Sequence, residues 1–203
     1  MATTTQMSGR TAVLRDAIVE IILAEGFLGV QMSDLAARLN CSKSTLYAIA
    51  PSKEQLLVAV VRTFFRRATE RVEQAVDPEA PAIERIGAYL NAVAVELAPA
   101  SPAFFADLER FTPAGDIYRQ NTQIAAARIQ DLVLEAAPGI DPKFLGVVVR
   151  LMMESIHRGD ISRATGLDDS AAYRALAELI LAGLSGGPTA PTTPHPMKRR
   201  KSP

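Results

Sequence analysis

The chain has 203 residues, is 48% hydrophobic, and balances 22 Lys and Arg against 22 Asp and Glu. This composition provides a packed core and excludes a wholly disordered protein. A single cysteine, Cys41, excludes an intramolecular disulfide and suits a reducing compartment. The first ten residues contain no secretory signal, and no apolar stretch approaches the ~18–20 residues that span a bilayer, so we expect a soluble cytoplasmic protein without membrane contact.

We predict an all-α fold, because no segment alternates apolar and polar residues between hairpin turns. The first helix is expected at 10–25 and ends at Gly26. Two short helices follow at about 31–50, and a long helix begins after Ser52 and ends at Asp77-Pro78. Pro and Gly clusters separate the remaining expected helices, at 82–98, 102–111, 115–137, 141–163 and 169–185.

Residues 31–50 have the pattern of a helix-turn-helix that reads DNA. Asn40 is expected at the turn because asparagine tolerates the left-handed conformation, and Ser42 is a good N-cap for the second helix. Leu46 and Ile49 face inward, which leaves the polar residues of that helix on its exposed face. The first helix of this motif has an apolar face with i, i+3, i+4, i+7 spacing, formed by Met32, Leu35, Ala36 and Leu39.

In order along the chain, Glu25-Gly26-Phe27, Ser33–Ala37, Ser42–Tyr47 and Pro51–Leu57 resemble the N-terminal DNA-binding domain of TetR family transcriptional regulators. The resemblance covers roughly residues 10–60. The chain departs from the family pattern with Gln31 for threonine, Asn40 for glycine and Ala50 for an aromatic residue. The resemblance implies a DNA-binding domain at 10–60, followed by a larger helical ligand-binding and dimerisation domain at 61–186.

The resemblance also implies which residues contact double-stranded DNA. Thr45 and Tyr47 contact backbone phosphates, and Lys53 anchors a phosphate at the start of the long helix. Lys43 and Ser44 approach base edges, while Met32 and Ser33 lie near the phosphate backbone. The expected set is therefore Met32, Ser33, Lys43, Ser44, Thr45, Tyr47 and Lys53.

The charge of this region leaves an alternative open. Residues 1–60 carry five basic and five acidic side chains, so phosphate contacts must come from a few placed groups and from helix N-termini. The segment Ala48-Ile49-Ala50 offers few base contacts. The alternative is a helical ligand-binding or interaction protein that has lost sequence-specific DNA binding.

The last two expected helices are apolar around most of their circumference, so they must be covered on more than one side. We expect the same pair from a second copy as the cover, giving a four-helix interface in a homodimer, which suits a palindromic operator. Ordinary core burial is the alternative. The expected interface comprises Leu145, Val148, Val149, Met152, Ile156, Leu176, Leu179, Ile180 and Leu184.

A ligand pocket is expected in the second domain. Few charged residues face inward there, which favours an apolar or aromatic effector over a metal or phosphate compound. Many of the candidates could equally be core residues. They are Phe65, Tyr89, Phe104, Phe105, Phe111, Tyr118, Gln123, Arg150, Met152, Met153 and His157.

No enzymatic or cofactor site is expected. Gly183–Gly187 matches the G-x-S-x-G pattern of hydrolases but ends a helix, whereas a nucleophile elbow needs a strand-to-helix turn. Two histidines and one cysteine make none of the familiar zinc sites. Cys41 is expected to pack under the turn, with a redox switch as the alternative.

The residues at 187–203 contain five prolines and the run Lys198-Arg199-Arg200-Lys201, which predicts a disordered tail. It is either a sequence-independent tether to DNA or simply a solubilising tail. Together, these features predict a homodimeric, ligand-responsive transcriptional regulator, most simply a repressor. Its long helix from Ser52 transmits the change that releases a palindromic operator.

Overall fold

The computed structural model describes residues 2–137, 139 and 141–185, and every regular element in this part of the chain is a helix. The predicted all-α fold is confirmed. The predicted tail at 187–203 lies outside the described residues. In chain order the helices are α1 (Ala2–Glu25), α2 (Met32–Arg38), α3 (Lys43–Ile49), α4 (Lys53–Gln74), α5 (Ala82–Leu97), α6 (Pro102–Arg110), α7 (Thr112–Ala136), α8 (Pro142–His157), α9 (Asp160–Thr165) and α10 (Asp169–Ser185).

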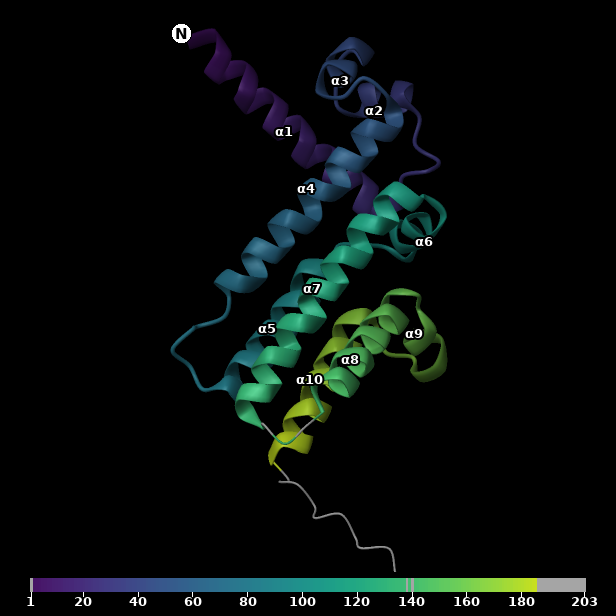
Figure 1. Ribbon diagram of the computed structural model, residues 1–203. Coiled ribbons are helices and arrows are strands. Elements are labelled where there is room, and N and C mark those ends of the chain that lie inside the picture. Colours follow the sequence, from purple (N-terminus) through teal and green to yellow (C-terminus); the bar gives the residue numbers. More distant parts are fainter. Residues whose placement is uncertain (1, 138, 140, 186–203) are drawn as a thin grey trace, which may run out of the picture.

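The short helices α2 and α3 lie at one end of the molecule, and α8, α9 and α10 lie toward the other (Figure 1). Helix α4 connects the two regions and packs against α5 and α7. Helix α5 packs against α10, α7 against α8, and α1 against both α4 and α6. Buried side chains from Ile18 to Ala177 form one continuous cluster. The expected division at residue 60 therefore falls inside α4, and the two regions share a core.

The expected local signals set several helix ends. Gly26 ends α1 in the left-handed region, at φ 78°, and Asn40 adopts φ 47° in the turn between α2 and α3. The hydroxyls of Ser42 and Ser52 accept hydrogen bonds from the amides of Thr45 and Gln55, which caps α3 and α4. Residues 26–53 therefore fold locally as their sequence predicts.

Two expected boundaries are wrong. The single helix expected at 141–163 is broken, because α8 ends at His157 and Gly159 adopts φ 72° before α9 begins at Asp160. The amide of Gly159 donates to the carbonyl of Ile156 at 2.9 Å, as in a glycine-terminated helix. The break expected at 112–115 is instead the first turn of α7, where Pro113 is accommodated because its nitrogen needs no acceptor.

Candidate DNA-reading surface and effector cavity

Helix α3 presents a polar face to solvent and an apolar face to the core. Leu46 and Ala50 are buried, whereas Lys43, Ser44 and Tyr47 are exposed, with Tyr47 46% accessible. The half-buried Thr45 hydroxyl lies 2.8 Å from the Ser42 oxygen. Four of the expected DNA-contacting side chains are thus presented on one short helix, and three of them are exposed.

The other three expected DNA contacts differ in their surroundings. Ser33 is exposed in the first turn of α2. Met32 is buried, because it belongs to the inward face of α2 with Leu35, so the expectation that its side chain contacts DNA is corrected. Lys53 is half-buried, and its ammonium donates to the carbonyl oxygen of Leu28 at 2.9 Å.

The charges around this surface are largely paired. Arg38 makes two hydrogen bonds of 2.7 Å with Glu25, and these bonds lower the pKa of the Glu25 carboxyl. Lys43 makes no ion pair with any described residue. Cys41 is half-buried and packs against the core cluster, which is the packing role expected for it. Among the described residues of α2, α3 and the start of α4, the cations without an ion pair are therefore Lys43 and Lys53.

A carboxylate from α6 holds the segment that precedes α2. Asp107 is 9% exposed and accepts hydrogen bonds from the amides of Phe27, at 2.6 Å, and Leu28, at 2.8 Å. A Cβ at Gly26 would lie 2.8 Å from the same carboxylate oxygen, so this close approach requires glycine. Sequence reasoning missed Asp107, because its partners are backbone amides about eighty residues away.

A cavity with about 440 Å³ of space free of protein atoms, including its opening to solvent, lies between α4, α5, α7 and α8. Five of the expected ligand-binding residues line it: Phe65, Tyr89, Tyr118, Met153 and His157. The rest of its wall is mostly apolar, with polar groups from Thr69, Glu96, Asn121 and Thr122 that were not expected. Thr122 follows Tyr118 by one helical turn, and this i, i+4 polar pair is the sequence signal that was overlooked.

The remaining expected ligand residues do not line this cavity. Phe104 is fully buried in the core, and Phe111 packs edge-on against Phe27 with ring centroids 6.2 Å apart. Gln123 points to solvent on α7, and Met152 packs against the core cluster from a half-buried position. Arg150 pairs with Glu154 at 2.9 Å. Gln123, Met152 and Arg150 are turned away from the cavity-lining faces of α7 and α8. Phe104 and Phe111 belong to α6 and its C-cap, which contribute no residue to the cavity wall.

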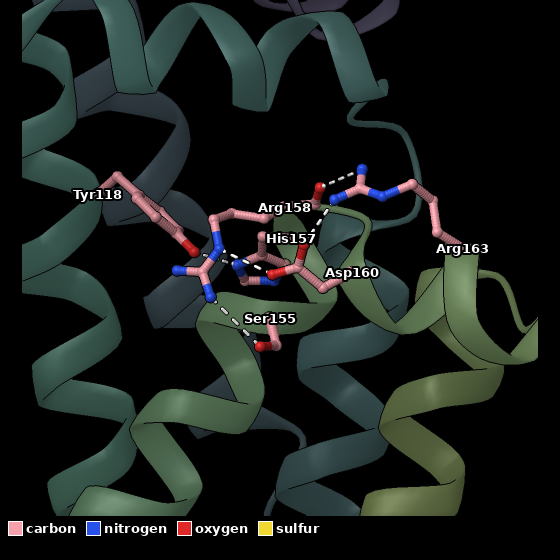
Figure 2. Close-up of polar contacts among 6 residues, drawn as sticks. All are labelled: Tyr118, Ser155, His157, Arg158, Asp160 and Arg163. Atoms are coloured by element: carbon pink, nitrogen blue, oxygen red, sulfur yellow. Dashed lines mark hydrogen bonds and ion pairs between the residues drawn. The ribbon is translucent and has the colours of Figure 1, made fainter.

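Phe105 does not line the cavity itself but contacts its wall. The Phe105 ring stacks on the imidazole of His157, with centroids 4.7 Å apart and planes 9° from parallel. His157 in turn hydrogen-bonds through both ring nitrogens, with Tyr118 at Nδ1 and with Tyr173 at Nε2, the latter at 2.7 Å. Figure 2 shows the Tyr118 hydroxyl directed at the imidazole.

Burial sets the ionisation of this cluster. Because His157 is buried, its pKa is lowered to about 3, so the imidazole is neutral at physiological pH. Burial likewise raises the pKa of the Tyr118 and Tyr173 hydroxyls well above their usual range, and that of Tyr89 to about 12. All four groups are therefore uncharged.

The turn after α8 carries a compact charge cluster beside this wall (Figure 2). Arg158 donates to Asp160 at 2.9 Å and to the Ser155 hydroxyl at 3.3 Å. Arg163 donates to the same carboxylate at 2.5 Å and to the carbonyl of Arg158 at 3.2 Å. Both guanidinium groups are thus committed to partners within the turn.

The outward faces of α8 and α10 expose large apolar side chains. Phe144 is 68% and Leu179 66% accessible, and Val147, Val148 and Leu151 continue the stripe on α8. Of the expected interface residues, Val149, Ile156 and Leu176 are buried within the chain's own core. Leu145, Met152, Ile180 and Leu184 are half-buried. Val149, Ile156 and Leu176 are therefore core residues, whereas Val148 and Leu179 belong to the exposed stripe, because the apolar residues of α8 and α10 divide into an inward and an outward set.

Other expected features have simple placements. Gly183 and Ser185 lie in the last turn of α10, in helical rather than strand-to-helix geometry. Within the described residues, no group of three or more His, Cys, Asp and Glu side chains is arranged to hold a metal ion. No helix in the same part of the chain is long and apolar enough to cross a membrane.

Comparison with known proteins assigns the N-terminal region. Residues 14–60 match the family model described as bacterial regulatory proteins, tetR family. Comparison with curated proteins gave no significant match.

Solved structures share the whole fold. A TetR-like transcriptional regulator from Rhodococcus sp. RHA1 is 18% identical with a TM-score of 0.63, covering 92% of this chain and 98% of that one. A putative transcriptional regulator from Pseudomonas aeruginosa PAO1 is 15% identical with a TM-score of 0.65, covering 89% and 92%. FadR from Bacillus subtilis, solved with stearoyl-CoA, is 19% identical with a TM-score of 0.60, covering 84% and 97%.

Proposed function

We propose that this chain, whose residues 14–60 match the tetR family of bacterial regulatory proteins, is a homodimeric repressor that a small effector releases from DNA. The effector binds in the cavity between α4, α5, α7 and α8. One observation supports the proposal above all: the chain has an exposed polar face on α3 and a cavity between α4, α5, α7 and α8, and one continuous core joins the two regions.

DNA recognition rests on the exposed face of α3. Lys43 and Ser44 lie in its first turn, where they reach base edges when the helix enters the major groove. Tyr47 and the N-terminal amides of α3 contact phosphates beside them. Lys53 uses its remaining donors for a phosphate, because its bond to Leu28 occupies only one of the three.

Dimerisation rests on the exposed stripe of α8 and on Leu179 of α10. Large exposed apolar groups that gather on one face are typical of an interaction surface. A second copy of the same pair covers this stripe in a four-helix arrangement about a two-fold axis. Two α3 helices about 34 Å apart then read a palindromic operator.

The cavity favours an effector that is largely apolar or aromatic. Most of its wall comes from Phe65, Val72, Val93, Leu97 and similar side chains. The similar fold of FadR, which was solved with stearoyl-CoA, supports ligand binding within this helical arrangement. An apolar ligand gains affinity here by burying surface against these side chains.

Helix α6 offers a short physical route from the cavity to the DNA-reading region. Its Phe105 stacks on His157 in the cavity wall, and Asp107, two residues later, holds the amides of Phe27 and Leu28. The carbonyl of Leu28 is in turn held by Lys53 at the start of α4. An effector that displaces the wall shifts α6, and with it the segment that positions α2 and α3. The long helix α4 adds the second route that the sequence predicts.

The effector acts by favouring a state in which the two α3 helices no longer match the operator spacing. A ligand that prefers that state about 100-fold supplies about 2.7 kcal/mol of coupling, within the range usual for allosteric proteins.

A second candidate is a helical ligand-binding protein without sequence-specific DNA binding. The observation that favours it is the balanced charge of residues 1–60, five basic against five acidic. The two candidates differ in their dependence on salt, because a DNA binder loses affinity for duplex as salt rises.

The decisive experiment measures binding of the purified full chain to its own upstream promoter DNA by fluorescence anisotropy. It is run at two salt concentrations with excess nonspecific competitor. We expect competitor-resistant binding that weakens modestly with salt, since few cations face the DNA. If binding to promoter DNA never exceeds binding to a scrambled duplex, and a genome-wide selection of bound fragments also yields none, the second candidate is correct.

A further inference from the structure

The polar groups in the cavity wall are unequal in what they can offer a ligand. The carbonyl of Asn121 accepts from the Thr69 hydroxyl at 3.1 Å, and one of its two amide hydrogens is donated to the carbonyl of Ile117 at 2.9 Å. Glu96 is paired with Arg71, with the guanidinium Nε 2.7 Å from its carboxylate. The donors that remain in the wall are uncharged: hydroxyl groups and the second amide hydrogen of Asn121.

The hydrogen bonds through His157 have one favoured direction. A neutral imidazole has one N–H donor and one acceptor nitrogen. Tyr173 is fully buried, and among the described residues its hydroxyl meets only His157 Nε2. If Tyr173 accepted from Nε2–H, its own hydroxyl hydrogen would be left without an acceptor in the core, which is more costly than an unused oxygen lone pair. Tyr173 therefore donates to Nε2, and the imidazole proton sits on Nδ1.

This direction leaves the hydroxyl hydrogen of Tyr118 unused by His157. The Nδ1–H group donates to the Tyr118 oxygen, so the Tyr118 hydrogen must find another acceptor. The hydroxyl of Thr122 hydrogen-bonds to Tyr118 and opposes the rise in its pKa, which is the effect of a group that donates to the Tyr118 oxygen. The Tyr118 oxygen therefore accepts from both His157 and Thr122, which leaves the Tyr118 hydrogen free and uses the Thr122 hydrogen.

Thr122 has no backbone acceptor for that hydrogen. The Thr63 hydroxyl donates to the carbonyl of Ala59 one turn back at 2.8 Å, but no bond of this kind is found for Thr122 among the described residues. The Tyr118 oxygen is the acceptor for Thr122, and Tyr118 presents its own hydroxyl hydrogen to the cavity that both residues line.

Tyr89 supplies a second hydroxyl. It is 2% exposed and lines the same cavity, and among the described residues no hydrogen-bond partner is found for its hydroxyl. The ring is enclosed, but the hydroxyl oxygen is accessible from the cavity, where water or a ligand completes its hydrogen bond. It adds a donor to the same wall.

We propose that the effector carries an uncharged hydrogen-bond acceptor, such as a ketone, ester or ether oxygen, that binds the hydroxyls of Tyr118 and Tyr89 while its apolar body fills the cavity. The inference rests on the proposed function of the cavity as the effector site. It excludes a carboxylate or an ammonium group at this position. Glu96 is neutralised by Arg71, and Arg158 and Arg163 are committed to Asp160, so no unpaired charge in these clusters faces an ionic ligand.

The test uses two matched series of probes on the full chain, by displacement of the neutral fluorophore N-phenyl-1-naphthylamine. The aromatic series is 2-acetylnaphthalene, 2-ethylnaphthalene and 2-naphthoate, and the linear series is 2-octanone, n-octane and octanoate. Each series compares a neutral acceptor, a hydrocarbon and an anion of similar shape. The proteins are the wild type, Tyr118→Phe, Tyr89→Phe and the control Thr63→Val, which removes a hydroxyl of α4 that is bonded to the carbonyl of Ala59 and does not line the cavity.

The expected result is a change in the ratio of ketone to hydrocarbon affinity. Removing a cavity hydroxyl weakens ketone binding five- to tenfold, or about 1–1.4 kcal/mol, and leaves hydrocarbon binding unchanged. The ratio of ketone affinity to hydrocarbon affinity removes the hydrophobic contribution that the two ligands share, as in a double-mutant cycle. Thr63→Val changes neither affinity, and both anions bind more weakly than the matching ketones.

Tyr89→Phe keeps the inference testable if Tyr118→Phe is unstable, because Tyr89 makes no internal hydrogen bond that the variant would lose. An unchanged ratio in these variants, or tighter binding by either anion, overturns the inference. If the hydrocarbons bind and release promoter DNA, and the ketones bind no more tightly, the inference is wrong but the proposed function stands. If no member of either series binds, the cavity is not the effector site, and the effector part of the proposed function falls with it.

Discussion

The DNA-reading region and the cavity region are built from contacts of very different range. Helices α2 and α3 have seven residues each. The Ser42 hydroxyl caps α3 by accepting a hydrogen bond from the amide of Thr45, three residues later. The cavity instead draws its wall from four helices, and its central histidine bonds to tyrosines 39 and 16 residues away. One region is organised by neighbours in the sequence, and the other by distant residues.

This difference separates the consequences of substitution in the two regions. Residues such as Lys43 and Tyr47 are exposed, so we expect substitutions there to have little effect on stability and to act on the proposed DNA contact alone. His157, Tyr173 and Asp107 are buried and paired, so changing them leaves polar partners unsatisfied. Asp107 connects the two regions, because it is a buried residue of the second region that accepts hydrogen bonds from backbone amides of the first.

The largest expected effect comes from Leu179→Glu, which tests whether the second region needs a second copy. A charge on an apolar two-fold interface meets its own symmetry mate and is desolvated, which costs several kcal/mol. We expect a monomer by analytical ultracentrifugation and loss of operator binding by at least about 100-fold. Val95→Glu is the matched control, because Val95 is 59% exposed on α5 and away from the stripe. If Leu179→Glu stays dimeric, this surface is not the interface.

Asp107→Ala breaks the link between the two regions. The variant loses two hydrogen bonds to a carboxylate and should be destabilised by about 2–4 kcal/mol, measured by urea unfolding. We also expect the effector to change operator affinity by less in the variant than in the wild type. Asp116→Ala is the control, since Asp116 is exposed and pairs only with Arg119 in the same helix. Equal coupling in both variants would show that α4 alone carries the signal.

The ionisation of His157 predicts acid sensitivity in the cavity region. Its pKa is about 3 in the folded chain and about 6.5 when unfolded, so the unfolded state binds more protons between these values. Stability from this group is present above pH 6.5 and falls as the pH is lowered, by about 2 kcal/mol between pH 7 and pH 5. Carboxylates also contribute to the dependence of the unfolding free energy on pH. The measurement is therefore the difference between the wild type and His157→Phe in the slope of unfolding free energy against pH. Equal slopes between pH 5 and pH 7 would contradict a neutral buried imidazole.

The smallest effect is expected for Tyr47→Ala, which isolates the DNA-reading region. Loss of one phosphate contact should weaken operator binding about five- to tenfold, or about 1–1.4 kcal/mol. The midpoint of thermal unfolding and the dimer should be unchanged, because Tyr47 is exposed. Tyr47→Phe separates the hydroxyl from the ring. An unchanged affinity in a gel-shift titration would show that α3 does not face the DNA.

The sequence alone determined the fold class, the helix-turn-helix and most helix boundaries. Local features carry that information: Gly26 and Asn40 adopt the left-handed region as expected, and Ser42 and Ser52 cap the helices that follow them. The exposure of Lys43, Ser44 and Tyr47 also follows from local helical phase.

Only the tertiary structure decided which apolar residues line a cavity, which fill the core and which remain exposed. Phe65 and Phe104 have the same side chain, yet one lines the cavity and the other is enclosed by the core. On α8, Val148 is exposed and Val149 is buried, although both lie in one apolar run. The partners of Asp107 and His157 were likewise hidden, since they come from distant segments. Periodicity fixes the phase of a helix but not the identity of the helix that packs against each face.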